Sequence, residues 1–131
     1  MTDRSLDWLR QAERDLEEAA AARAAGRHER ACFAAHQSAE QAVQALHSRI
    51  GQEAWGHVVA QLLTELPSSV SVPVGLIHQA RALDNFYIPT RYPNAHPSGA
   101  PFKRYRPLQS ETGIRSAGAI LAFVRAALAG P

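Results

Sequence analysis

The sequence predicts an all-α protein, an up-and-down helical bundle of about five helices with a long proline-rich loop before the last one. Its strong apolar repeats have a spacing near 3.6 residues, and none has the two-residue alternation of a strand. The chain is also rich in Ala, Leu, Glu and Arg, whose side chains lose little freedom in helices. At 131 residues it has the length of one domain, 1–131.

The two N-terminal helices are predicted over residues 5–25 and 28–50. Ser5 is the expected N-cap of the first, and Gly26 is expected to end it. Because the connection is short, the two helices should form an antiparallel hairpin. Apolar residues form a stripe on each helix, and the alanines of the second stripe let another helix approach closely. The stripes are Leu9, Ala12, Leu16 and Ala19, then Ala31, Ala35, Ala39, Ala42, Leu46 and Ile50.

Three further helices complete the predicted bundle. A short helix is expected over residues 57–66, and a fourth over residues 76–87, where Pro89 stops it. The last is expected over residues 108–128. The Val- and Ser-rich segment 69–74 could resemble a strand, but it has no partner strand, and an isolated strand is unstable.

The segment 88–107 is expected to be a long loop. It contains five prolines, which cannot continue a helix. Loops of this length are uncommon in compact domains and are often functional. The segment is therefore the first place to look for a site.

Charge is distributed unevenly along the chain, whose formal net charge is +2. Up to Leu66 there are 7 Arg against 10 Asp and Glu, giving −3. From Pro67 onward there are 7 Arg and Lys against Asp84 and Glu111, giving +5. A basic half attracts phosphates, although it can also serve solubility alone.

The single cysteine, Cys32, cannot form an internal disulfide, and the chain has no thiol cluster for zinc. The first residues include the charged Asp3 and Arg4, which predict no signal peptide. We also expect no apolar stretch long enough to span a membrane. These observations predict a cytoplasmic protein without cofactor or metal.

Three blocks of sequence, residues 8–16, 32–42 and 83–93, carry a recognisable pattern. The second contains Phe33-x-x-x-Gln37-x-x-Glu40, and the third reads Tyr-Ile-x-Thr-Arg-Tyr-Pro from residue 87 to residue 93. In this order and spacing the blocks resemble the HEPN domain family over nearly the whole chain. His57 also stands where that family often has a histidine. The chain departs at Gln44-Ala45-Leu46-His47, where relatives commonly have a Lys-Ala-Leu run.

The resemblance implies a helical bundle that usually dimerises. Genes of such proteins often lie beside a minimal nucleotidyltransferase, and members divide into RNA-cleaving toxins and non-catalytic binders of nucleotides or nucleic acids. We therefore expect a nucleotide- or RNA-binding module, partner of a minimal nucleotidyltransferase in a toxin–antitoxin-like pair. The alternatives are a metal-independent ribonuclease toxin and a non-catalytic structural subunit. A symmetric homodimer is expected through the alanine-rich second helix and the fourth helix.

Arg91 and His96 are the candidate catalytic residues. Four residues separate them, which resembles the family's Arg-x(4–6)-His ribonuclease motif. Metal-independent RNA cleavage needs a base for the 2′-hydroxyl proton and a cation for the charge on phosphorus, and His and Arg can supply these. In the alternative interpretation, Arg91 only anchors the loop, through backbone carbonyls or a carboxylate such as Asp84.

The candidate nucleotide- or RNA-binding residues lie in the same loop. Cations bind phosphates while aromatic faces stack on bases, and here Phe102 and Tyr105 interleave with basic residues. A solvated basic approach to the last helix is the alternative. The candidate residues are Arg91, Tyr92, Lys103, Arg104 and Arg106.

His36, Gln37 and Glu40 form a polar patch on the second helix. They could line a nucleotide pocket or bond across a dimer, but the favoured interpretation is that they fix helix register from buried or half-buried positions.

The remaining polar and aromatic residues of note are expected to have structural roles. His47 and His57 are expected at the surface or an interface, Trp8 and Trp55 as core or interface anchors, and Cys32 as a small apolar residue.

Overall fold

The computed structural model describes residues 3–130 and confirms the all-α prediction, since these residues contain helices and no strand. The described residues form five α-helices and two short 3₁₀ helices. In chain order these are α1 (Ser5–Ala24), α2 (His28–Arg49), α3 (Val59–Thr64), α4 (Val74–Asp84), η1 (Pro93–Ala95), η2 (Pro101–Lys103) and α5 (Pro107–Ala129).

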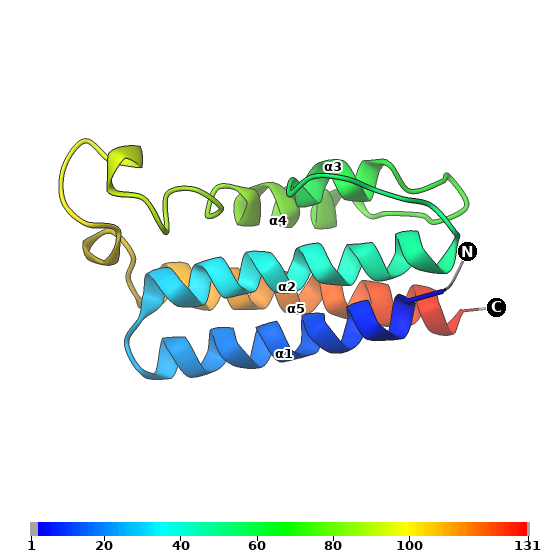
Figure 1. Ribbon diagram of the computed structural model, residues 1–131, viewed down its shortest axis with the longest axis horizontal. Coiled ribbons are helices and arrows are strands. Elements are labelled where there is room, and N and C mark those ends of the chain that lie inside the picture. The colour runs from blue at the N-terminus through cyan, green and yellow to red at the C-terminus, as the bar shows by residue number, and fades with distance from the viewer. Residues whose placement is uncertain (1–2, 131) are drawn as a thin grey trace.

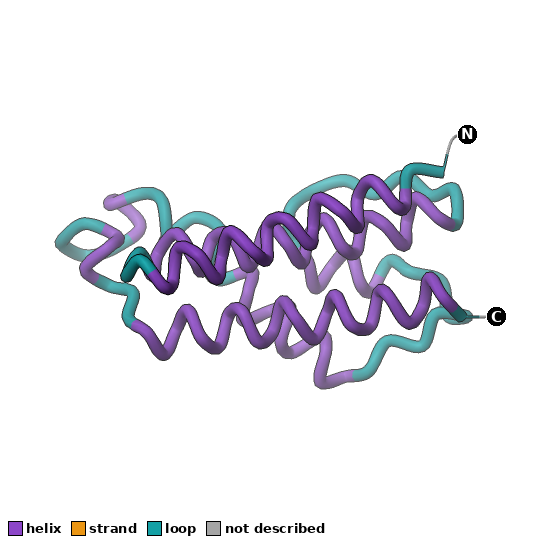
Figure 2. The backbone as a smooth tube through the Cα atoms, turned by 90° about the horizontal axis from the view of Figure 1, so that it is seen from below, coloured by secondary structure: helices purple, strands orange, loops and turns teal. Residues whose placement is uncertain are grey.

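The three long helices α1, α2 and α5 run side by side along the length of the molecule, and α3 and α4 lie along one side of α2 (Figure 1). The α1–α2 hairpin is antiparallel, as predicted. Figure 2 shows that the loop before α5 lies at one end of the bundle, and the two ends of the described chain lie at the other. The basic loop is thus remote from both termini.

Helix α2 is the central helix, because it contacts α1, α3, α4 and α5. Alanines on the facing stripes of α1 and α2 are fully buried, which brings the two helices close together. The alanine stripe of α2 is therefore covered within the chain. Among the stripe residues predicted from the sequence, the fully buried alanines are Ala12, Ala19, Ala31, Ala35, Ala39 and Ala42.

Helix α5 has the length and apolar composition that a membrane-spanning helix needs, which corrects the expectation that no such stretch exists. In this fold it packs against α1, α2 and α4. Its residues Ile120, Leu121 and Val124 are fully buried in the core. About 33% of its most apolar window is buried in this way, so packing against the other helices accounts for part of the apolar composition of α5.

The ends of α1 follow the prediction only in part. Gly26 ends the helix in the left-handed conformation, with φ of +77°, as expected. Ser5 is not the N-cap; it is the first helical residue and is buried. Its N–H donates to Oδ1 of Asp3 at 2.8 Å, so a carboxylate two residues earlier satisfies the free donor.

Helices α3 and α4 differ from the predicted ranges 57–66 and 76–87 because tertiary contacts set their ends. The first turn of α3 begins at Val59, where the Asp84 carboxylate accepts backbone N–H bonds. Helix α4 starts after Pro73 and ends at Asp84, and the chain then continues in turns up to residue 91.

The proline-rich loop is more ordered than its composition predicts. It contains η1 and η2, and each begins with a proline whose fixed φ suits a helical turn. The side chain of Gln109 accepts the N–H of Arg106 at 2.7 Å, which fixes the entry into α5.

Candidate functional site

Tyr87, in the turns after α4, is the centre of an aromatic cluster. Its ring centroid lies 4.9 Å from that of His57, nearly parallel at 19°. The rings of His36 and Phe33 lie 5.2 and 6.2 Å from it. These distances are typical of stacked or tilted aromatic pairs. The turn after α4 therefore joins α2 to the segment before α3.

Arg91 lies over the same cluster. Its guanidinium carbon is 4.6 Å from the ring centroids of both Phe33 and Tyr87, and 4.9 Å from that of Tyr92. The Nε–H donates to the Tyr87 carbonyl at 2.9 Å, so one of the anticipated backbone anchors is present. Among the described residues no carboxylate forms an ion pair with Arg91. The carboxylate of Asp84 binds His36 and the N–H of Val59 instead. The terminal nitrogens of Arg91 thus stay available to an anion.

A hollow of about 340 Å³ lies beside Arg91. Its floor includes Phe33, and its rim includes Phe102, which is 61% exposed. Glu29 and Arg30 contribute opposite charges, 4.0 Å apart. The hollow combines cations and aromatic faces and is lined by Glu29, Arg30, Phe33, Thr90, Arg91, Pro101 and Phe102.

His96 has partners of its own. Its Nε2–H donates to the Pro89 carbonyl at 2.6 Å, and its ring meets Tyr105 edge-on at 6.2 Å. Since a carbonyl only accepts, Nε2 carries the proton and Nδ1 is the acceptor of the neutral ring. Within the described chain no hydrogen bond joins His96 to Arg91. The loop therefore holds the two candidate catalytic residues through separate interactions.

The basic residues after Arg91 divide into two kinds. Arg104 donates to the Ser98 carbonyl at 2.6 Å and so braces the loop. Lys103 and Arg106 are exposed and have no ion pair in the part of the chain that the structure describes. Tyr92 is 46% exposed beneath Arg91. The fold thus places Lys103 and Arg106 where a ligand can reach them.

A buried polar network lies behind the aromatic cluster. The Asp84 carboxylate accepts the N–H groups of Val59 and Ala60 at 2.7 and 3.0 Å, and caps α3. It also accepts Nε2–H of His36 at 3.1 Å. That imidazole is fully buried and donates to the His57 carbonyl as well, at 2.9 Å. The network fixes the backbone of His57.

The side chain of His57 is fixed too. Its Nδ1 lies 2.9 Å from Oε1 of Glu40, a residue only 8% exposed. Because a carboxylate accepts, Nδ1 carries the proton, and Nε2 is left as the free nitrogen of the neutral ring. The His57 side chain is 57% exposed. The Glu40–His57 pair therefore presents an oriented imidazole to solvent.

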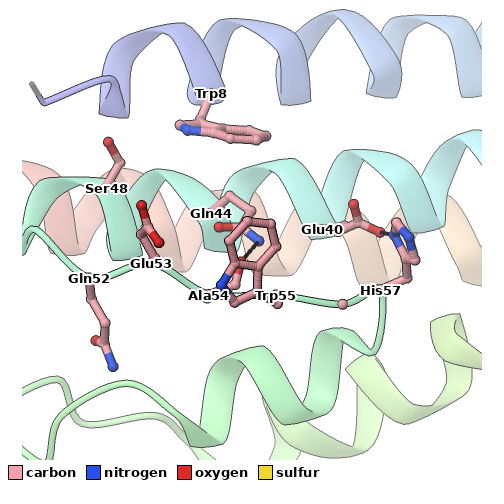
Figure 3. A pocket seen from close by; sticks show the side chains of 10 residues that line it. Trp8, Glu40, Gln44, Ser48, Gln52, Glu53, Ala54, Trp55 and His57 are labelled. Carbon is pink, nitrogen blue, oxygen red and sulfur yellow. Dashed lines mark hydrogen bonds and ion pairs between the residues drawn. The ribbon is translucent and has the colours of Figure 1, made fainter.

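His57 and Glu40 lie at one end of a cavity of about 480 Å³ between α1, α2 and the segment before α3. In Figure 3, Trp8 extends from α1 toward α2, and Trp55 comes from the segment before α3. Gln44 of α2 donates to the Ala54 carbonyl at 3.0 Å and holds that segment in place. The cavity is lined by Trp8, Glu40, Gln44, Ser48, Gln52, Glu53, Ala54, Trp55, Gly56 and His57.

The expectation that His47 lies at the surface is wrong. His47 is fully buried, and its Nε2–H donates to the Leu62 carbonyl at 2.8 Å, so it joins α2 to α3. Trp55 is 82% exposed, which excludes a place in the core and leaves the expected role as an interface anchor. Trp8 does pack against the core, as expected.

Two groups near the loop have raised pKa values. Burial, together with the charge of Glu29, raises the pKa of the Cys32 thiol to about 12. Burial also raises the pKa of Tyr105 above its ordinary value, with the neighbouring Cys32 as the smaller cause. Both groups stay neutral at physiological pH, so Cys32 is a small buried residue, as expected. In residues 3–130 no group of three or more metal-ligating side chains is assembled.

The Glu40–His57–Tyr87 arrangement left only weak signs in the sequence. Glu40 and Tyr87 belong to the motifs of the second and third blocks, and His57 stands alone. No short sequence motif contains them, because His57 lies 17 positions after Glu40 and Asp84 lies 48 positions after His36. The fold alone brings them together.

This helical bundle, with its polar network at the α2–α4 junction, matches a known family. The HEPN domain model matches residues 5–127, and the chain belongs to the HEPN domain family. No curated protein matches the sequence.

Solved structures agree with this assignment. Protein TT1696 from Thermus thermophilus is 46% identical, with a TM-score of 0.93 over 95% of this chain and 98% of that one. ST0689, an archaeal HEPN homologue, is 38% identical, with a TM-score of 0.80 over 97% and 99% of the two chains. A HEPN domain protein from Thermotoga maritima, TM0613, is 34% identical, with a TM-score of 0.79 over 95% and 99%.

Proposed function

We propose that this HEPN domain binds a nucleotide or single-stranded RNA at the loop end of the bundle. The observation that carries the proposal is the position of Arg91, whose guanidinium lies over Phe33 and Tyr87 beside a hollow rimmed by exposed Phe102. The stack fixes the cation without neutralising it, so a phosphate can bind its terminal nitrogens while a base stacks on an aromatic face.

Charge around the hollow supports the same proposal. Arg30, Arg91 and Lys103 are exposed on this end of the bundle, which concentrates positive charge near the hollow. Glu29 is the opposing charge in its lining. Tyr92 and Arg106 extend the surface, and Arg104 supports it by bracing the loop.

Fluorescence anisotropy with a labelled single-stranded RNA tests the proposal. If about three phosphates are neutralised, affinity should fall about 10- to 20-fold between about 50 and about 200 mM salt. The double variant Lys103→Glu/Arg104→Glu should abolish binding. The matched control, Arg10→Glu/Arg14→Glu, removes two exposed arginines from α1 and should bind nearly as well as wild type. Equal affinity of the two double variants would remove the basic loop from the site.

A metal-independent ribonuclease activity is the second candidate function. The observation in its favour is the hydrogen bond from His96 to Pro89, which leaves Nδ1 as an available base within the same loop as Arg91. Cleavage would require a substrate that contacts both residues, since each is bonded to a different backbone carbonyl of the loop. A purely structural subunit is the third candidate.

We also propose partners for this domain. A symmetric homodimer is supported by exposed apolar side chains on the α3–α4 side, since Val58, Val74 and Ile88 are 49, 71 and 45% exposed. The alanine stripe of α2 is buried within the chain, so the proposal uses the α3–α4 side for the contact. Light scattering at micromolar concentration should give the mass of two chains, and a monomer mass would contradict the dimer.

Two further proposals concern the partner and the location. Membership of the HEPN family supports a minimal nucleotidyltransferase as partner. The single buried thiol supports a cytoplasmic location.

A further inference from the structure

The Glu40–His57 pair and the cavity beside it lie outside the proposed phosphate site, and the ring of Tyr87 links the two. Arg91 and His57 both lie against that ring, at 4.6 and 4.9 Å from its centroid. A single aromatic side chain therefore separates Arg91 from His57. From His57 the cavity continues along α2 toward Trp55 and Trp8.

The cavity and the hollow at Arg91 have different chemistry. The charged groups in the cavity lining are the acids Glu40 and Glu53, and its other ionisable group is His57. No Arg or Lys lines it, so a phosphate would be repelled. Its walls instead offer two indoles and the amides of Gln44 and Gln52. Such a lining suits the uncharged parts of a nucleotide, the base and the sugar.

His57 is fixed as a hydrogen-bond acceptor at the entrance of the cavity. The Nδ1–H of His57 donates to Glu40, and the His57 carbonyl accepts a hydrogen bond from His36. These two bonds fix both the ring and the backbone of His57. The free Nε2 of the neutral ring can only accept. Its natural complement is a hydroxyl donor. In a nucleic acid strand the 2′-hydroxyl of ribose is that donor, and it is absent from DNA.

We propose that His57 selects RNA over DNA by accepting a hydrogen bond from a 2′-hydroxyl, and that the Trp8–Trp55 cavity takes the attached base. The inference rests on the proposed binding function and names its ligand as single-stranded RNA. A phosphate binds at Arg91, the sugar crosses Tyr87 to reach Nε2 of His57, and the base stacks on Trp55. A base stacked on Trp55 would cover an indole that is otherwise 82% exposed, which gives this exposed side chain a role in binding.

The test compares RNA and DNA oligonucleotides of one sequence in the same anisotropy assay. Wild type should bind the RNA about 5- to 10-fold more tightly, the worth of one hydrogen bond. His57→Phe keeps a ring against Tyr87 but has no acceptor, so it should lose affinity for RNA alone and bind both strands equally. The matched control His78→Phe changes an exposed histidine of α4 and should keep the RNA preference.

Trp55→Ala tests the base position separately. It should weaken RNA and DNA binding alike, about 10-fold, because a base of either strand stacks on the indole. Equal binding of RNA and DNA by wild type, or a preserved preference in His57→Phe, would overturn the inference and leave the proposed function standing. An unchanged Trp55→Ala affinity would overturn the base position. If neither oligonucleotide binds wild type, the proposed function fails and this inference fails with it.

Discussion

The carboxylate of Asp84, at the end of α4, accepts a hydrogen bond from the buried imidazole of His36 on α2 at 3.1 Å. The same carboxylate caps α3 through two backbone N–H groups. One side chain thus joins three helices and fixes the backbone on which the candidate site depends.

Removal of this carboxylate should destabilise the fold strongly. Asp84→Ala leaves two helical N–H groups without their acceptor and removes one of the two acceptors of the buried His36 ring, so the free energy of unfolding should fall by about 2–4 kcal/mol. Urea denaturation measures it. Glu17→Ala removes an exposed carboxylate from α1 and serves as the control, with a change within about 0.5 kcal/mol. A similar midpoint for both variants would refute the structural role of Asp84.

Two glycines of α5 should respond oppositely to alanine. A Cβ at Gly118 meets nothing within 4 Å, so Gly118→Ala should stabilise the protein by about 0.5–1 kcal/mol through helix propensity. A Cβ at Gly113 would lie 3.1 Å from Cε2 of Phe86, beside the site. Gly113→Ala should therefore be less stable than Gly118→Ala by about 1–3 kcal/mol in the same denaturation assay. Equal stabilisation by both would show that Phe86 moves away freely.

Cys32 should be unreactive in the folded protein. Burial raises the pKa of its thiol to about 12 from 9.0, and the thiolate is the reactive form. A chromogenic disulfide at about pH 8 should label the native protein about 100- to 1000-fold more slowly than the denatured one. Cys32→Ser gives the blank. Rapid stoichiometric labelling of the native protein would contradict the burial.

The same pKa shift links stability to pH. A folded-state pKa above the unfolded value means that the neutral thiol contributes its full stabilisation below pH 9.0. This contribution is lost as the pH rises from 9.0 toward about 12. Between these values wild type should lose stability more steeply than Cys32→Ser, as followed by circular dichroism.

If the domain is a ribonuclease, cleavage should survive chelation and leave a 2′,3′-cyclic phosphate. His96→Ala and Arg91→Ala should each lower the rate by about 10² to 10⁴. His28→Ala offers a comparison, since this half-buried histidine contacts Ser110 and lies outside the motif. Purified wild type that leaves RNA intact, or a His96→Ala variant as fast as wild type, would remove the enzyme hypothesis.

The bundle could be predicted because the signals of its long helices, apolar periodicity and helix-ending residues, lie within short stretches of sequence. The apolar stripes of α1, α2 and α5 repeat every three or four residues, and Gly26 follows the end of α1 as predicted. Helix α4, in contrast, already ends at Asp84, before the predicted stop at Pro89. The bounds of α3 could not be found this way. Its first N–H groups are satisfied by Asp84, 25 residues further along the chain.

For the candidate site too, some features could be predicted from the sequence and others depended on the tertiary structure. Sequence alone identified the family pattern, the basic character of the loop and the residue types suited to phosphate, among them Arg91 and Lys103. Only the tertiary structure decided which of these meet. It joined His96 to the Pro89 carbonyl, buried His47, exposed Trp55 and paired His57 with Glu40. The reason is physical: helical periodicity depends on residues three and four positions apart, whereas side-chain hydrogen bonds and stacking depend on how the finished helices pack.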